Sequence, residues 1–197
     1  MLRADEMQRP SRTAMAISSN GDFVVYTAIE ENPGPQTKSR LYMRKMGQLE
    51  AKLVPGTEGG INPFLSPDNR WVGFWAEGKL KKVPVEGGIP TPLCDASMLF
   101  GANWGDNDGI VFADGYAAGL SRISSAGGEC ESLSAPDSKR EESRHSLPSW
   151  LPNGKAVLST IMKHDLDPKP SLALLRLDTH EWNGILLDAA DAKYWSS

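Results

Sequence analysis

The chain has 197 residues, of which 40% are hydrophobic and 23% charged, a balance typical of a globular protein with a sizeable core. Its formal net charge of -4 excludes the basic field that nucleic-acid-binding proteins present. No apolar run approaches the roughly 20 residues that a membrane-spanning helix needs, and residues 1–15 lack the apolar core of a secretory signal. We therefore expect no nucleic-acid partner and no membrane span in this chain.

The compartment stays open at this point. A chain with no targeting signal is cytoplasmic as it stands, whereas a chain cut from a membrane-bound parent would be periplasmic or extracellular. Two cysteines, Cys94 and Cys130, are too few for a disulfide scaffold. With three scattered histidines they also predict no structural zinc site, so we expect no metal and no cofactor.

A unit of about forty residues recurs along the chain. Leu53, Leu93 and Leu133 are forty residues apart, and so are the Gly-Gly pairs at 87–88 and 127–128. A turn motif rich in Asn, Asp, Gly and Pro recurs with looser spacing. Proline presets φ, Asn and Asp close local hydrogen bonds, and glycine accepts a positive φ, so each copy predicts a chain reversal. The copies stand at 18–21, 66–69, 105–109 and 151–154.

Four strands are predicted in each unit, in chain order. Residues 1–12 form a lead-in that could add a strand, residues 135–144 form a charged linker, and residues 191–197 resemble the first strand of a further unit. The units cover 13–58, 61–96, 99–135 and 145–190. Their strands are expected near 13–17, 22–28, 40–46 and 52–55, then 62–65, 71–75, 80–85 and 91–94, then 102–104, 110–113, 120–124 and 131–133, and finally 148–150, 156–161, 172–178 and 182–187.

The strands alternate polar and apolar residues with period two, and no segment keeps a helical period, which indicates an all-β protein. Four-stranded units that repeat every forty residues favour a β-propeller over a sandwich, because each blade must bury the same positions against its neighbours. The predicted fold is a β-propeller of about four four-stranded blades in one domain, residues 1–197. Whether the ring closes or remains an open, incomplete propeller is left undecided.

The second unit carries a resemblance to a known family. Its segment Phe64-Leu65-Ser66-Pro67-Asp68, followed by the strands of 80–93, resembles the WD40-like PD40 repeat of TolB-type β-propellers. The match is more degenerate at 100–133 and 148–158, and Ser19-Asn20 stands where Pro-Asp is expected. The stretch LKKVPVEGG is similar to the propeller region of bacterial membrane-bound Ser/Thr kinases. The resemblance covers about residues 13–190 and implies a fold rather than an activity, because propellers host many functions.

TolB-type propellers usually have six or more blades, so the resemblance implies a truncated propeller. An open arc of four blades would expose strand edges and an apolar blade face, which proteins normally cover. We therefore expect a homo-oligomer that forms through exposed blade edges.

Two groups of residues are candidate sites. Inner strands line the central channel of a propeller, so Arg144 and His145, which precede the inner strand of the last unit, could contact an anionic ligand; a hydrogen-bonded structural histidine is the competing interpretation. Two polar loops, 29–39 and 162–170, join second to third strands and should emerge on one face, where binding function tends to lie. The predicted contact-face residues are Glu30, Glu31, Asn32, His164, Asp165 and Asp167.

Catalytic motifs are not apparent in the sequence. There is no Gly-x-Ser-x-Gly elbow, and no serine can be assigned a base and an orienting acid. Asp106 and Asp108 alternate as calcium ligands do, but no distal glutamate follows at the right distance, so a turn is the better interpretation.

The sequence therefore predicts a non-enzymatic module that binds protein or peptide, built on a TolB-like β-propeller. The alternative is a small-ligand-binding propeller, or a hydrolytic or lyase propeller, with a site in the central channel. Apolar inner strands such as Met15-Ala16-Ile17 and Pro63-Phe64-Leu65 favour the interaction module. A gene fragment without selected activity is a third possibility that the sequence leaves open.

Overall fold

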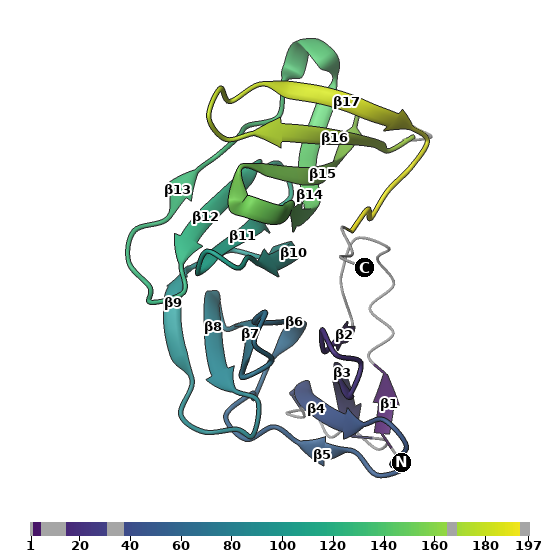
Figure 1. Cartoon of the computed structure of the whole chain (residues 1–197), viewed down its shortest axis with the longest axis vertical. Helices are drawn as coiled ribbons and strands as arrows, with labels where there is room; N and C mark the ends of the chain where they lie inside the picture. The colour runs from purple at the N-terminus through teal and green to yellow at the C-terminus, as the bar shows by residue number, and fades with distance from the viewer. Residues whose placement is uncertain (1, 5–14, 31–37, 165–168, 194–197) are drawn as a thin grey trace. The chain divides into compact units, whose positions relative to one another are not determined.

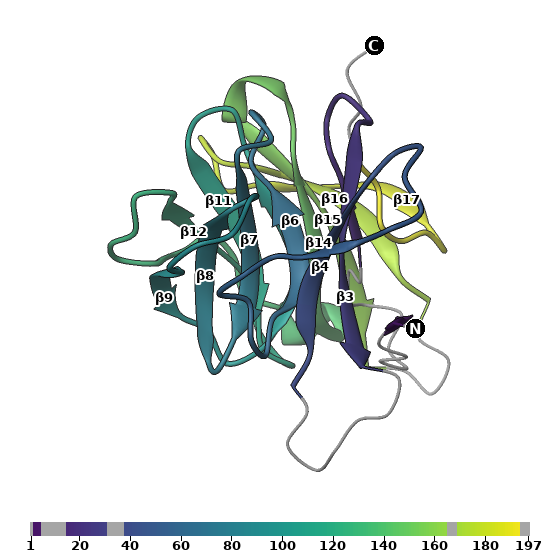
Figure 2. The same ribbon diagram turned by 90° about the horizontal axis from the view of Figure 1, so that it is seen from below.

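The computed structural model describes residues 2–4, 15–30, 38–164 and 169–193, and this part of the chain is almost entirely β-structure (Figure 1). The chain divides into two compact units, Met1–Ala96 and Ser97–Ser197, and each unit holds two antiparallel sheets. Figure 2 shows strands of one such sheet, β6, β7 and β8, side by side. Among the described residues, no helix is long and apolar enough to cross a membrane.

The strands lie within a few residues of their predicted positions, with one exception described below. In the first unit they are β1 Leu2–Ala4, β2 Met15–Ile17, β3 Phe23–Glu30, β4 Arg40–Lys45, β5 Lys52–Leu53, β6 Ile61–Leu65, β7 Trp71–Ala76, β8 Lys79–Pro84 and β9 Thr91–Asp95. In the second unit they are β10 Leu99–Trp104, β11 Gly109–Asp114, β12 Leu120–Ser124, β13 Glu131–Ser132, β14 Glu142–Trp150, β15 Ala156–Lys163, β16 Ser171–Arg176 and β17 Trp182–Leu187. Two 3₁₀ turns, η1 Ser138–Arg140 and η2 Pro152–Gly154, flank β14.

Each sheet follows the chain order, so neighbouring strands are joined by short reversals. Three sheets run β6-β7-β8-β9, β10-β11-β12-β13 and β14-β15-β16-β17. The first sheet has a fifth strand, because β1 and β2 both pair with the edge of β3 that β4 leaves open. β1 is thus the additional strand expected in the lead-in.

Each unit buries an apolar core between its two sheets. Successive inward residues of β7, Val72, Phe74 and Ala76, are fully buried, as the period-two pattern requires. Full burial of one valine or phenylalanine side chain contributes about 1.5–3 kcal/mol to the stability of the fold. The core of the first unit contains Val25, Leu41, Met43, Val54, Val72, Phe74, Ala76 and Val83. The core of the second contains Phe100, Val111, Ala113, Leu120, Leu133, Trp150, Val157 and Leu175.

The recurrent turns do more than reverse the chain. In the first unit the Ser19 backbone N–H donates to Asn69 Oδ1 at 2.9 Å, and Asn69 Nδ2 donates to Ser19 Oγ at 2.8 Å. One residue lies between β2 and β3 and the other between β6 and β7, so the two copies of the motif join two sheets. In the second unit the side chain of Asn107 lies against Gly154, where an added Cβ would be 2.5 Å from Asn107 Nδ2. The turn motif therefore also fastens each sheet to the next within a unit.

The first strand of three sheets contains a β-bulge at a similar position. The register shifts between Ile61 and Phe64 in β6, between Leu99 and Ala102 in β10, and between Ser146 and Ser149 in β14. A bulge bends the strand and disrupts the pairing of an exposed edge. Each bulge contains a residue with positive φ: Asn62 at 54°, Gly101 at 107° and Leu147 at 50°.

Residues 142–147 correct the sequence interpretation, which placed Glu142, Ser143 and Arg144 in a charged linker and began the strand at Pro148. The strand β14 begins at Glu142. Its buried side chains include His145, Ser146 and Ser149, which are polar. A buried strand that satisfies polar side chains by hydrogen bonding lacks the apolar alternation on which the prediction depended.

Replacing Gly101 by alanine is expected to destabilise the second unit by about 1–3 kcal/mol, because an L-residue is strained at this φ. The new Cβ would also lie 2.8 Å from the Cα atom of Leu147. The free energy of unfolding from urea titration measures the effect. Gly184→Ala is the control, since a Cβ there meets nothing within 4 Å. Equal stability of the two variants would contradict the close approach of β10 and β14.

Candidate functional site

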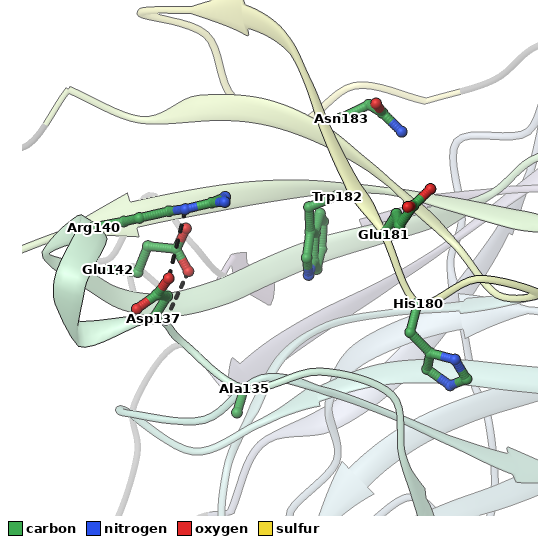
Figure 3. Close-up of a pocket in the computed structure, with 8 residues that line it drawn as sticks. All are labelled: Ala135, Asp137, Arg140, Glu142, His180, Glu181, Trp182 and Asn183. Carbon is green, nitrogen blue, oxygen red and sulfur yellow. Dashed lines mark hydrogen bonds and ion pairs between the residues drawn. The ribbon is translucent and has the colours of Figure 1, made fainter.

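A pocket of about 490 Å³ lies in the second unit, beside the segment that connects β13 to β14. Its walls come from that segment and from residues at the start of β17 (Figure 3). The lining residues are Ala135, Asp137, Arg140, Glu142, His180, Glu181, Trp182 and Asn183.

The connecting segment is shaped by a capped 3₁₀ turn. Asp137 Oδ1 accepts a hydrogen bond from the Lys139 backbone N–H at 2.9 Å, which caps the start of η1. Glu141 ends the turn in the left-handed region, with φ of 59°. The Asp137 backbone N–H then donates to Glu142 Oε2 at 2.8 Å. These bonds place two carboxylates, Asp137 and Glu142, on the same side of the pocket.

A chain of hydrogen bonds leads from β12 to the Glu142 carboxylate. The Leu120 backbone N–H donates to Ser134 Oγ at 2.9 Å, Ser134 Oγ lies 2.7 Å from His145 Nδ1, and His145 Nε2 lies 3.0 Å from Glu142 Oε2. Burial lowers the pKa of His145 despite the opposing effect of Glu142, because the imidazole is only 1% exposed. The imidazole is therefore neutral near pH 7.

The donors and acceptors of this chain can be assigned from that protonation state. A carboxylate only accepts, so the single ring proton of His145 is on Nε2 and points to Glu142. Nδ1 then accepts the hydroxyl proton of Ser134, whose oxygen in turn accepts from Leu120. The Ser134 hydroxyl, both ring nitrogens of His145 and Glu142 Oε2 all have partners, and the effect is to hold the Glu142 carboxylate at the pocket wall.

From the sequence no serine could be assigned a base and an orienting acid, whereas the structure places Ser134 and Glu142 at the two ring nitrogens of His145. Ser134, His145 and Glu142 have the residue types and spacings of a nucleophile, base and acid. The arrangement is closed, however. The imidazole packs edge-on against the Trp182 ring, with centroids 4.8 Å apart, and Ser134 Oγ already accepts the Leu120 N–H. The contacts describe a buried positioning network.

Arg144 and His145 are neighbours on β14 with different surroundings. The guanidinium of Arg144 lies over the Phe100 ring, 4.7 Å from its centroid, while His145 is buried among Ser134, Glu142 and Trp182. A shared role for the two residues as ligand contacts stays a prediction.

The predicted contact-face loops are only partly within the described residues. Glu30 ends β3, where it pairs with Leu2. His164 follows β15 and is exposed, and its backbone N–H donates to the Glu141 carbonyl at 2.8 Å, which places it beside η1. The other four residues lie outside the described residues: Glu31, Asn32, Asp165 and Asp167.

The segment 105–109 forms the turn that was preferred over a calcium loop. Asn107 Oδ1 accepts from the Gly109 N–H at 3.2 Å, and the Gly105 N–H donates to the Gly109 carbonyl at 2.8 Å. Within the part of the chain that the structure describes, no group of three or more His, Cys, Asp or Glu residues is arranged to hold a metal ion.

The fold is that of a TolB-like β-propeller, and solved structures show the same architecture. TolB from Agrobacterium tumefaciens aligns with a TM-score of 0.72 and 15% identity over 93% of this chain and 69% of its own. TolB from Acinetobacter baumannii aligns with a TM-score of 0.66 and 12% identity, over 92% of this chain and 45% of its own. An oligogalacturonate lyase from Vibrio parahaemolyticus aligns with a TM-score of 0.60 and 12% identity, over 88% and 52%.

Sequence identities this low show only that these proteins share a fold with this chain. No protein-family model matches the sequence, and no curated protein matches it. The chain spans about two thirds of the Agrobacterium protein and about half of the other two. Because the matched structures include TolB proteins and a lyase, the shared architecture is compatible with more than one function.

As the pH is lowered, the stability of the protein should fall more steeply than the stability of the His145→Gln variant. The pKa of His145 is lowered in the folded state, so below pH 6.5 the unfolded chain binds a proton that the folded chain does not. The difference between the slopes should be at most about 1.4 kcal/mol per pH unit. Urea titrations between pH 7.5 and 5 measure it. The variant His180→Gln, at an exposed histidine, serves as the control for the loss of one imidazole.

Proposed function

We propose that this chain is a non-enzymatic propeller module that binds protein or peptide, and that the strand β17 is its main contact element. The observation that carries the proposal is the exposure of three consecutive apolar residues at the edge of a sheet. Ile185, Leu186 and Leu187 in β17 are 55%, 56% and 79% exposed.

The edge at β17 differs from the last strands of the other sheets. β5 and β13 are only two residues long, and β9 contains Pro92, which has no N–H to donate. Short strands and prolines are the usual means by which proteins prevent edge-to-edge pairing. β17 has six residues, Trp-Asn-Gly-Ile-Leu-Leu, without a charge or a proline, and among the described strands it pairs only with β16.

A strand with these properties is suited to β-augmentation, in which an extended segment adds to a sheet edge. Backbone hydrogen bonds then supply affinity, and alternate side chains supply specificity. The first occupant that we propose is a second copy of the chain, paired antiparallel through β17. Such a contact uses the same patch on both copies and gives a closed dimer.

The alternative function, a small-ligand, hydrolytic or lyase site, has the pocket beside Trp182 as its support. Against a catalytic site stands the closed hydrogen-bond chain, because His145 is 1% exposed and both its ring nitrogens have partners. The interaction module needs no such chemistry, and we favour it for that reason.

The absolute mass in solution, from light scattering on a sizing column, tests the proposal. We expect twice the mass of one chain for the parent protein. Leu187→Lys should shift the mass toward one chain, because a charge placed in a paired apolar edge is desolvated. Leu49→Lys is the matched control, since Leu49 is 95% exposed in the turn between β4 and β5. A parent protein that is monomeric at every concentration would contradict self-association through β17.

A further inference from the structure

We propose that the pocket between the η1 segment and the start of β17 binds an organic cation, namely the ammonium or guanidinium group of a lysine or arginine side chain in a polypeptide. The cation site itself goes beyond the self-association of β17 and does not depend on it. The polypeptide source of the cation does rest on the proposed function.

The charge of the lining favours a cation. The lining contains three carboxylates, of Asp137, Glu142 and Glu181, and one guanidinium, that of Arg140. The Arg140 Nε atom lies 3.5 Å from Asp137 Oδ2, so the positive charge of Arg140 already forms an ion pair with the Asp137 carboxylate. Figure 3 shows Trp182 between the group formed by Asp137, Arg140 and Glu142 and the residues Glu181 and His180. A ligand beside this ring would therefore have a carboxylate on either side.

Glu142 is the member of the lining whose position is most strongly determined. Its side chain is 12% exposed, and two donors, the Asp137 N–H and His145 Nε2, both contact Oε2. Among the described residues no donor contacts Oε1 within hydrogen-bonding distance. Charge-assisted hydrogen bonds to a carboxylate are stronger than neutral ones, and a site from which water is partly excluded strengthens them further. A cation at Oε1 would supply the donor that this oxygen lacks.

Trp182 offers the second element of a cation site. Cations are attracted to the face of an indole ring, with Trp the most favourable of the aromatic side chains. The ring is held from one side by the buried His145, at 4.8 Å and an interplanar angle of 62°. A ring whose orientation is already determined loses little conformational entropy when a ligand binds. Both elements of the site, carboxylate and ring, thus depend on the same buried imidazole.

The size and place of the pocket indicate a side chain of a longer ligand. The volume of about 490 Å³ is within the range of small-ligand sites. Trp182 and Asn183 line the pocket and are the first two residues of β17. A partner polypeptide that pairs with the outer edge of β17 in place of a second copy, whose own β17 has no basic residue, would pass the pocket there with a basic side chain able to enter it.

Calorimetric titration of the full chain with acetyl-Leu-Arg-Leu-amide tests the proposal. A peptide with citrulline in place of arginine has nearly the same shape without the charge, and we expect it to bind at least about tenfold more weakly. Binding of the arginine peptide should weaken as salt is raised from 20 to about 200 mM. Equal affinities for the two peptides would overturn the cation site, and no binding of either peptide would overturn the polypeptide source of the cation.

Variants locate the site. We expect Glu142→Gln and Glu181→Gln to weaken binding of the arginine peptide by about three- to tenfold each. Glu131→Gln is the control, because Glu131 pairs with Arg122 at 2.7 Å outside the pocket. Glu181 is exposed, and its side chain accepts no hydrogen bond from the described residues and interacts electrostatically with Arg176, so its variant remains informative if Glu142→Gln unfolds. Equal binding by the Glu181 and Glu131 variants would overturn the assignment.

Agmatine, a free guanidinium compound, separates the two parts of the proposal. Binding of agmatine and the peptide supports both parts, whereas binding of agmatine alone supports the cation site and overturns the polypeptide source. Leu187→Lys, which targets only the β17 edge, should leave agmatine binding unchanged. Loss of agmatine binding in that variant would contradict a site that is independent of β17 association.

Discussion

The burial of one apolar sheet face against another is the interaction on which each unit of this protein depends. A four-stranded sheet with a single apolar face is not stable in water unless that face is covered. In the first unit Val72 and Phe74 of β7 meet the apolar face of the preceding sheet, and in the second Val111 and Val157 occupy comparable positions in β11 and β15. Two of the leucines spaced by forty residues, Leu93 and Leu133, are buried, whereas Leu53 is 38% exposed.

The same requirement explains the polar features between sheets. The turn motif joins Ser19 to Asn69 in one unit and brings Asn107 against Gly154 in the other, so residues selected for reversing the chain also align adjacent sheets. The bulges of β6, β10 and β14 disrupt the edge of each first strand. The last strand, β17, lacks such protection. Its exposed apolar residues are therefore the feature of this chain that most needs a partner.

The pocket of the second unit arises where the chain passes from one sheet to the next. The segment after β13 must return to the first strand of the following sheet, and in doing so it places Ser134 and Glu142 on two sides of His145. A buried polar network of this kind is stabilising only when every member is satisfied, and here the backbone donors of Leu120 and Asp137 complete it. The network determines the positions of the Glu142 carboxylate and the Trp182 ring, and so the chemistry of the pocket.

The sequence by itself determined the all-β class, the repeat and nearly every strand, because period-two alternation and turn chemistry are local properties that can be read in order. It did not determine the start of β14, since the buried residues there, such as His145 and Ser146, are polar and hide the alternation. The grouping of Ser134, Glu142, His145 and Trp182 was decided only by the tertiary structure. These residues come from β14, from β17 and from the segment after β13, and only the packing of one sheet on the next brings their side chains within hydrogen-bonding or van der Waals distance.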